Sequence, residues 1–200
     1  MDDFILQSRY ERTLMDTLTA IHHRQSVGDV LPDPIPRSLI EKILAAGTQA
    51  PNHYKVRPWR FFVLTGWGLN RLGDVLAKSL SSRNADLPPE ALAKERTKPL
   101  RAPLIIAVGV EKPNEPKISE VENICAAAAA CQNILLAAQS LGLAAIWRTG
   151  PAAIDPLVKK FLGMEEDQHL IAFLYIGYPA KPSALPERPD FSDRTTWLDK

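Results

Sequence analysis

Three short segments of this chain gather the side chains that could do chemistry. The first, residues 49–59, crowds polar, cationic and aromatic side chains around Pro51 and Pro58. Each proline lacks a backbone N–H and restricts the residue before it, so a helix cannot run through this segment. A loop rich in hydrogen-bonding groups, held between an apolar helix and an apolar strand, is the usual build of a binding site. An ordinary solvated connection would have a similar composition, so this loop alone leaves both interpretations open.

The second segment is Arg24-Gln25-Ser26, which stands where a helical pattern ends. An arginine presents a fixed fork of N–H donors that suits a phosphate group, and the serine hydroxyl adds another donor. The alternative is that Arg24 only stabilises the C-terminal end of the helix through its dipole.

The third segment, Trp147-Arg148-Thr149, stands at the carboxyl end of a predicted strand. Ligands tend to bind at that end of the strands in open sheets. The alternative is a strand-end turn whose arginine reaches into solvent.

The chain offers few groups for acid–base or nucleophilic catalysis. It has no nucleophile elbow, no His/Cys set at metal-ligand spacing and no glycine-rich phosphate loop. His22 and His23 diverge on a helix and fit solvated cations at its end, while His169 precedes a strand and reads as structural. His53, in the first segment, is the candidate general base when that segment is considered alone. The residue types favour either simple binding or chemistry supplied by a cofactor, with no metal.

Length and composition describe an ordinary globular protein. The 200 residues suit a single domain, with residues 1–12 as an N-terminal extension and the proline-rich residues 180–200 as a C-terminal arm. A formal net charge of +1 gives no reason to expect nucleic acid or an anionic membrane as the main partner. Cys125 and Cys131 fall in one predicted helix and fit small core residues of a reduced, cytoplasmic protein.

Hydrophobic periodicity predicts helices and strands in alternation. Helices are expected over residues 13–23, 37–46, 69–80, 120–141 and 156–163, with a short surface helix over 89–97. Strands are expected over residues 59–64, 104–110, 144–147 and 170–176. The long helix should begin at a capping box from Ser119 to Glu122, and its apolar part should be buried in a soluble core. The polar stretch 81–99 is a candidate mobile lid. This order indicates an α+β or α/β sandwich.

Taken in order, these segments resemble the FMN-dependent nitroreductase family over nearly the whole chain. The resemblance rests on Arg24-Gln25-Ser26-Val27 followed by Pro34-Ile35-Pro36, and on Gln49-Ala50-Pro51-Asn52-His53 followed by Arg57-Pro58-Trp59. It also rests on Arg101-Ala102-Pro103 before a strand, on Ile146-Trp147-Arg148-Thr149-Gly150, and on the strand that ends in Gly177-Tyr178-Pro179. The spacing is closest to the short, single-domain YdjA-like branch.

The resemblance implies an α+β, three-layer sandwich whose central mixed or antiparallel sheet is flanked by helices. It also implies a homodimer with FMN at the subunit interface. Arg24, Gln25 and Ser26 would hold the flavin phosphate and ribityl chain. Gln49 and His53 would contact the flavin from the other subunit. Trp147, Arg148 and Thr149 would line the remaining side. Residues 137–142 would be associated with NADPH.

The activity implied is an oxidoreductase that passes a hydride from NAD(P)H through bound FMN to an electron-poor small molecule, such as a nitroaromatic or a quinone, by a ping-pong mechanism. The chemistry would occur at FMN N5, so no side chain would act as a catalyst. A flavin-fragmenting, benzimidazole-forming enzyme and a non-catalytic flavin-binding sensor are the alternatives. One departure is Gly28, where many family members have a lysine that reaches the flavin; His53, Lys55 or Arg148 could replace that charge.

Overall fold

The computed structural model of the chain describes residues 15–84 and 86–199. The expected N-terminal extension, residues 1–12, lies outside these described residues, as does the predicted start of the first helix at residue 13. The described chain is built on a four-stranded antiparallel sheet with the strand order β1-β2-β4-β3. The strands are β1 (Trp59–Thr65), β2 (Leu104–Val110), β3 (Ala144–Arg148) and β4 (His169–Gly177). All four lie where the hydrophobic runs predicted them.

The central strands β2 and β4 owe their place to continuous apolar sequence. Every residue of β2 is buried, because helices cover both faces of the sheet there. Its side chains alternate between two separate cores: Leu104 and Ile106 belong to one core, and Ile105 and Ala107 belong to the other. The segment after Arg24 joins the β3 edge of the sheet through a parallel bridge from Ser26 to Ala145.

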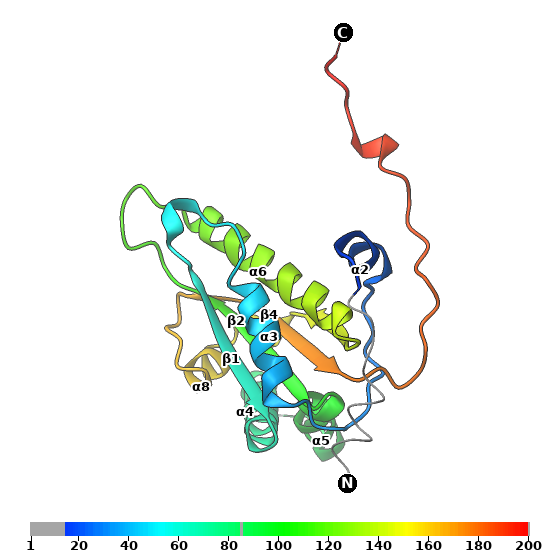
Figure 1. Cartoon of the computed structure of the whole chain (residues 1–200). Coiled ribbons are helices and arrows are strands. Elements are labelled where there is room, and N and C mark those ends of the chain that lie inside the picture. Colours follow the sequence, from blue (N-terminus) through cyan, green and yellow to red (C-terminus); the bar gives the residue numbers. More distant parts are fainter. Residues whose placement is uncertain (1–14, 85, 200) are drawn as a thin grey trace.

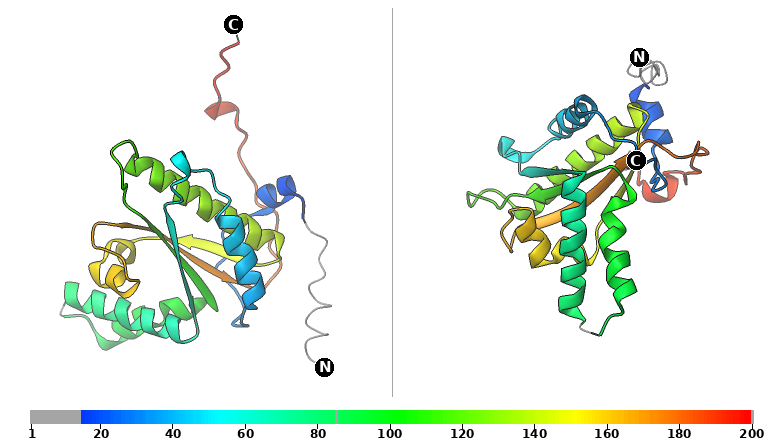
Figure 2. Two further views of the ribbon diagram at one scale, coloured as in Figure 1. Left: turned by 60° about the vertical axis from the view of Figure 1, so that its left-hand side comes forward. Right: turned by 90° about the horizontal axis from the view of Figure 1, so that it is seen from below.

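Helices cover the sheet on both sides, which makes three layers (Figures 1 and 2). On one face lie α3 (Arg37–Gly47) and α6 (Glu120–Ser140). On the other face lie α4 (Trp67–Arg83), α7 (Pro151–Ile154) and α8 (Pro156–Phe161). The short helix α2 (Thr17–His23) packs near the C-terminal end of α6. The structure therefore confirms the predicted α+β sandwich.

The long helix α6 packs along the whole of one core. It begins at the predicted capping box, in which the Glu122 carboxylate accepts the backbone N–H of Ser119. Among the described residues, α6 alone is long and apolar enough to cross a membrane, but here it packs against α3 and the sheet as a core helix. Small residues allow close packing: a Cβ on Gly47 of α3 would stand 2.9 Å from the Cγ1 atom of Ile134.

The two cysteines of α6 differ in their surroundings. Cys131 is fully buried, as predicted, but Cys125 is exposed, so the expectation of two core cysteines was wrong for Cys125. The two positions are six residues apart and therefore point to different faces of the helix. Both are free thiols.

The polar stretch 81–99 forms part of a helical hairpin. The helix α4 continues to Arg83, beyond its predicted end, and α5 (Pro89–Thr97) matches the predicted surface helix. The two helices lie side by side (Figure 2, right) and approach closely at Gly73. A Cβ at that position would collide with the backbone carbonyl oxygen of Arg96. A short 3-10 helix, η2 (Lys98–Arg101), then leads into β2.

Candidate functional site

The loop of residues 49–59 is held in an unusual backbone conformation. It contains a short 3-10 helix, η1 (His53–Lys55), and three of its residues have left-handed backbone angles: φ is 48° at Tyr54, 57° at Lys55 and 52° at Arg57. Such angles are uncommon outside glycine and persist only where the surroundings enforce them. Asn52 helps to enforce them, because its side chain accepts the backbone N–H of Arg57 at 2.8 Å and donates to the Ala50 carbonyl.

His53 is fixed by its neighbours within this loop. Its Nδ1 atom lies 2.9 Å from Oε2 of Glu122, and its ring stacks on Tyr54 with 4.1 Å between the ring centroids. The hydrogen bond from His53 lowers the pKa of the Glu122 carboxyl. About half of the His53 side chain is exposed. Gln49 is also exposed and makes only long contacts, 3.3 Å to the Thr48 hydroxyl and 3.5 Å to the Ala45 carbonyl.

The Arg24-Gln25-Ser26 segment lies along β3. Arg24 ends α2, and the backbone N–H of Val27 donates to the carbonyl of Ala145 at 3.0 Å. The C-terminal arm runs past this segment: Gln25 donates to the carbonyl of Ala184 at 2.7 Å, and Arg188 donates to the carbonyl of Arg24 at 2.7 Å. Burial, and secondarily the charge of Arg188, lower the pKa of the Arg24 guanidinium.

A first cavity of about 230 Å³ opens between this segment, the C-terminal arm and the end of α6. Gln139 and Gly142, from the stretch with the expected link to NADPH, contribute to its wall. The polar and charged side chains in its lining are those of His23, Gln25, Gln139, Lys181 and Ser183.

Trp147 and Arg148, the last two residues of β3, point to opposite faces of the sheet, and Thr149 follows the strand. Trp147 packs towards the α6 core, and its indole N–H donates to the carbonyl of Ile171 at 3.0 Å. Arg148 extends to the opposite face, where its guanidinium carbon lies 5.5 Å from the ring centroid of Tyr175. Arg148 and Thr149 both line a second cavity, which has a volume of about 280 Å³.

This second cavity combines an apolar floor with a basic rim. The floor is formed by α4, α7 and β4 through Leu72, Leu76, Leu80, Pro151, Ala152, Phe173 and Tyr175. The rim carries four cationic side chains and one carboxylate, from Arg83, Lys98, Arg101, Arg148 and Glu95. Burial raises the pKa of the Tyr175 hydroxyl, and the charges of Arg148 and Arg101 partly oppose that shift. A flat, anionic or electron-rich ring system fits these walls best.

Sequence reasoning missed most of this cavity. Glu95, Lys98 and Arg101 lie in the polar stretch before β2, which the sequence suggested only as a candidate lid or as part of a strand motif. The signal that could have found them is the cluster of charges directly before a fully buried strand, at the sheet end opposite that of the 49–59 loop. The sequence offered no reason to single out Tyr175, because it lies within the apolar strand β4.

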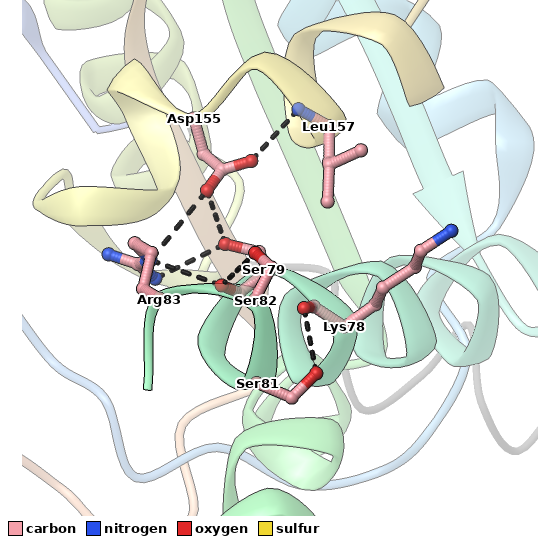
Figure 3. Close-up of polar contacts among 7 residues, drawn as sticks. All are labelled: Lys78, Ser79, Ser81, Ser82, Arg83, Asp155 and Leu157. Atoms are coloured by element: carbon pink, nitrogen blue, oxygen red, sulfur yellow. Dashed lines mark hydrogen bonds and ion pairs between the residues drawn. The ribbon is translucent and has the colours of Figure 1, made fainter. Parts of the chain in front are cut away.

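A buried polar network holds Arg83 at the cavity rim (Figure 3). The Asp155 carboxylate caps α8 by accepting the N–H of Leu157 at 2.9 Å, and it also accepts the hydroxyl of Ser79. Arg83 lies 3.8 Å from the same carboxylate and donates to the Ser79 hydroxyl at 3.2 Å. The predicted cap at Asp155 is confirmed, and the network joins α4 to α8.

The sequence-predicted residues form two groups within one chain. Arg24, Gln25 and Ser26 adjoin the β3 segment that carries Trp147, Arg148 and Thr149. Gln49 follows α3, which packs on α6 at Asn133, and His53 lies at the start of α6. The loop at His53 contacts the start of α6, whereas Gln139 and Gly142, which line the first cavity, lie at the end of α6. A helix of 21 residues is roughly 30 Å long, so one small ligand cannot contact both His53 and the first cavity of a single chain.

Within residues 15–84 and 86–199, no group of three or more His, Cys, Asp or Glu side chains is arranged to hold a metal ion.

Comparisons with known proteins agree with this architecture. The sequence profile of the Nitroreductase family matches residues 21–178. The chain is 34% identical over 186 residues to the Escherichia coli K12 protein named "Putative NAD(P)H nitroreductase YdjA", covering 92% of this chain and 100% of that protein. A nitroreductase-like protein of Bacillus cereus has a similar fold, with a TM-score of 0.81 at 24% identity over 94% of this chain and 99% of that one. A Desulfovibrio desulfuricans structure described as "a putative nitroreductase in complex with fmn" gives a TM-score of 0.69 at 26% identity, over 94% of this chain and 98% of that one.

Proposed function

The chain belongs to the nitroreductase family, and we propose that it is an NAD(P)H-dependent oxidoreductase that works with bound FMN. When bound, FMN would accept a hydride from NAD(P)H and deliver it, in a separate step, to an electron-poor acceptor such as a nitroaromatic or a quinone. The side chains would bind, orient and shield the reactants rather than form bonds with them.

The second cavity is the observation that carries this proposal. Its apolar floor suits the flat face of a flavin ring, and its basic rim suits the electron-rich edge of that ring. Arg148 and Thr149, expected from the sequence to touch the flavin, both line it.

We assign the flavin phosphate to Arg24 and Ser26, in the segment that runs beside β3. Ser26 is exposed and Arg24 is half-buried, and both stand beside β3, whose last residues reach the second cavity. The pKa of Arg24 is lowered because its guanidinium is partly withdrawn from water and lies near another cation, Arg188. An anion would relieve that repulsion, so Arg24 and Ser26 fit a phosphate. Gln25 stands at the first cavity beside Gln139 and Gly142, which we assign to the nicotinamide cofactor.

A homodimer would complete the site. His53 contacts α6 and Gln49 follows α3, both on one face of the sheet, whereas α4 and α7 line the second cavity on the other face, so these two residues would contact FMN as residues of a second subunit. A twofold arrangement would give two equivalent sites, each built from both subunits. The C-terminal arm, which exposes Leu185, Phe191 and Trp197, has the apolar side chains needed to embrace a partner.

The compartment that we propose is the cytoplasm, because both cysteines are free thiols. The substrate is a small molecule, and neither nucleic acid nor a membrane is required, in keeping with the net charge of +1.

The test is the absorbance spectrum of the purified protein with FMN. We expect a flavin spectrum that NADH or NADPH bleaches without oxygen and that an added quinone or nitroaromatic restores. A protein that takes up no FMN would overturn the proposal. Flavin that stays oxidised with both nicotinamides would instead indicate a binding protein. A benzimidazole product, formed when oxygen is admitted to the reduced FMN, would indicate a flavin-fragmenting enzyme.

A matched pair of variants ties the activity to the cavity. Arg101→Met removes a rim charge of the second cavity, whereas Arg71→Met removes an exposed arginine from the start of α4, where it lies over Trp67. Only Arg101→Met should weaken FMN binding, by about ten-fold, the value of one charge-assisted contact of about 1.4 kcal/mol.

A further inference from the structure

The side-chain space at Gly28 is more informative than its backbone conformation. Its backbone does not have the left-handed angles found at Gly66, Gly142, Gly150 and Gly163. Any residue could therefore adopt its conformation. What a side chain at this position would meet is specific: a Cβ would stand 3.4 Å from Nη2 of Arg148, with the next nearest atoms, from Ile146, at 3.9 and 4.0 Å. The missing side chain thus leaves room for the Arg148 guanidinium.

Arg148 lies between Gly28 and a rigid aromatic ring. Its guanidinium carbon is 5.5 Å from the ring centroid of Tyr175, a distance within the range of a cation–π contact. Tyr175 is only 9% exposed and sits in the central strand β4, so its ring cannot move aside. A bulky side chain at residue 28 would push against the guanidinium. Because the Tyr175 ring blocks movement towards β4, the guanidinium would have to leave its position over that ring.

Arg148 is also one of two described rim cations that lie beside no carboxylate. Lys98 pairs with Glu95 at 2.5 Å, and Arg83 lies 3.8 Å from the Asp155 carboxylate. Among residues 15–84 and 86–199, neither Arg148 nor Arg101 has a carboxylate partner. A positive charge held beside an apolar cavity floor acts on bound charge more strongly than one in open water.

We propose that Gly28 is a positioning residue that sets the reduction potential of the bound flavin through Arg148. By leaving its side-chain space empty, Gly28 lets the guanidinium lie over Tyr175 at the cavity rim. There the positive charge favours the negative charge that a flavin ring carries when reduced. This inference rests on the proposed function, since it requires FMN in the second cavity.

The experiment measures the reduction potential of FMN in the holoenzyme and in two single variants. Arg148→Met removes the charge and keeps a long, unbranched side chain. Gly28→Leu keeps the charge but fills its space. Both should lower the equilibrium constant for reduction of the flavin by about ten-fold, which corresponds to roughly 30 mV for two electrons. Gly28→Ala, whose Cβ makes only ordinary contact at 3.4 Å, should leave the potential close to that of the unaltered protein.

The double variant separates positioning from a general disturbance. Gly28→Leu should have no further effect in the Arg148→Met background, because the group through which it acts is gone. In the Arg101→Met background its effect should persist in full. Gly28→Lys combined with Arg148→Met places a cation in the emptied space and should restore the potential.

The outcomes are distinct. Unaltered protein that binds no FMN would overturn this inference together with the proposed function. FMN-loaded protein whose potential is the same with Arg148→Met would overturn this inference alone. So would a Gly28→Leu effect of equal size with and without Arg148. If Gly28→Leu or Arg148→Met fails to fold, Arg148→Lys is the substitute: its shorter side chain places the positive charge less far over the Tyr175 ring and should lower the potential by a smaller amount.

Discussion

One oxygen of Glu122, Oε2, accepts both the backbone N–H of Ser119 at 3.3 Å and a hydrogen bond from Nδ1 of His53 at 2.9 Å. The first contact closes the capping box of α6, and the second holds the imidazole of the 49–59 loop. The start of α6 and the position of His53 are therefore set by the same carboxylate.

This arrangement predicts a pH dependence of stability. The pKa of Glu122 is lowered, chiefly by the hydrogen bond from His53. A lowered pKa in the folded state contributes stability above the unfolded value, near 4.5, and that contribution is lost as the pH falls through the folded pKa. Glu122→Gln keeps a capping acceptor but not the charge. Urea unfolding at neutral pH and below pH 4.5 should show a smaller acid loss for Glu122→Gln, while Glu166→Gln, a matched surface exchange, should behave like the unaltered protein.

His53 should act on the flavin by contact rather than by proton transfer. His53→Ala removes one hydrogen-bonding contact, so we expect FMN to dissociate about two- to ten-fold more readily, with the pH profile of turnover unchanged. The matched control is His169→Ala, which removes the same kind of pair, a 2.8 Å contact with Glu120, and should leave FMN binding unaltered. A variant that retains FMN fully but loses a titrating group from its rate would identify His53 as a general base.

Two glycines of one helix should respond in opposite ways to alanine. Gly73→Ala forces α4 and α5 apart at the Arg96 carbonyl, and we expect the free energy of unfolding to fall by about 1–3 kcal/mol. Gly68→Ala meets Leu64 at an ordinary 3.6 Å, so it should be neutral or stabilising by up to about 1 kcal/mol. Denaturant unfolding measures both. Equal effects would show that the close approach at Gly73 is not maintained in solution.

The two cysteines should differ in reactivity. Burial raises the pKa of Cys131 to about 12, so its thiolate, the reactive form, is scarce at any physiological pH. In a Cys125→Ser variant, alkylation of the native protein followed by mass spectrometry should find no label until denaturant is added. Labelling of that variant at the rate of an exposed thiol would show that α6 leaves the core readily.

The elements of the fold were largely predictable, because apolar periodicity is local. The strands, α5, the capping box of α6 and the Asp155 cap follow from side chains within a few residues of one another. The conformation of the 49–59 loop was not predictable in this way. Its three left-handed residues are not glycines and depend on contacts from Asn52 and from the start of α6.

The second cavity was only half visible in the sequence for a similar reason. Arg148 and Thr149 stand at the carboxyl end of a strand, where ligands tend to bind in open sheets. Glu95 and Lys98, however, reach the cavity only because α5 folds back on α4. The departure at Gly28 left three candidate cations. Of these, Arg148 lies beside Gly28, whereas His53 and Lys55 lie in the loop that packs on the start of α6.

The length of α6 also has a genetic consequence. If each site draws Gln49 and His53 from one subunit and Arg24 and Arg148 from the other, two defective alleles can repair each other. A chain altered at Gln49 and His53 and a chain altered at Arg24 and Arg148 would each be inactive alone. In a mixed dimer, however, one site collects every defect and the other is intact. Co-expression should restore activity at about a quarter of all sites under random pairing, and no restoration would mean that each site lies within one chain.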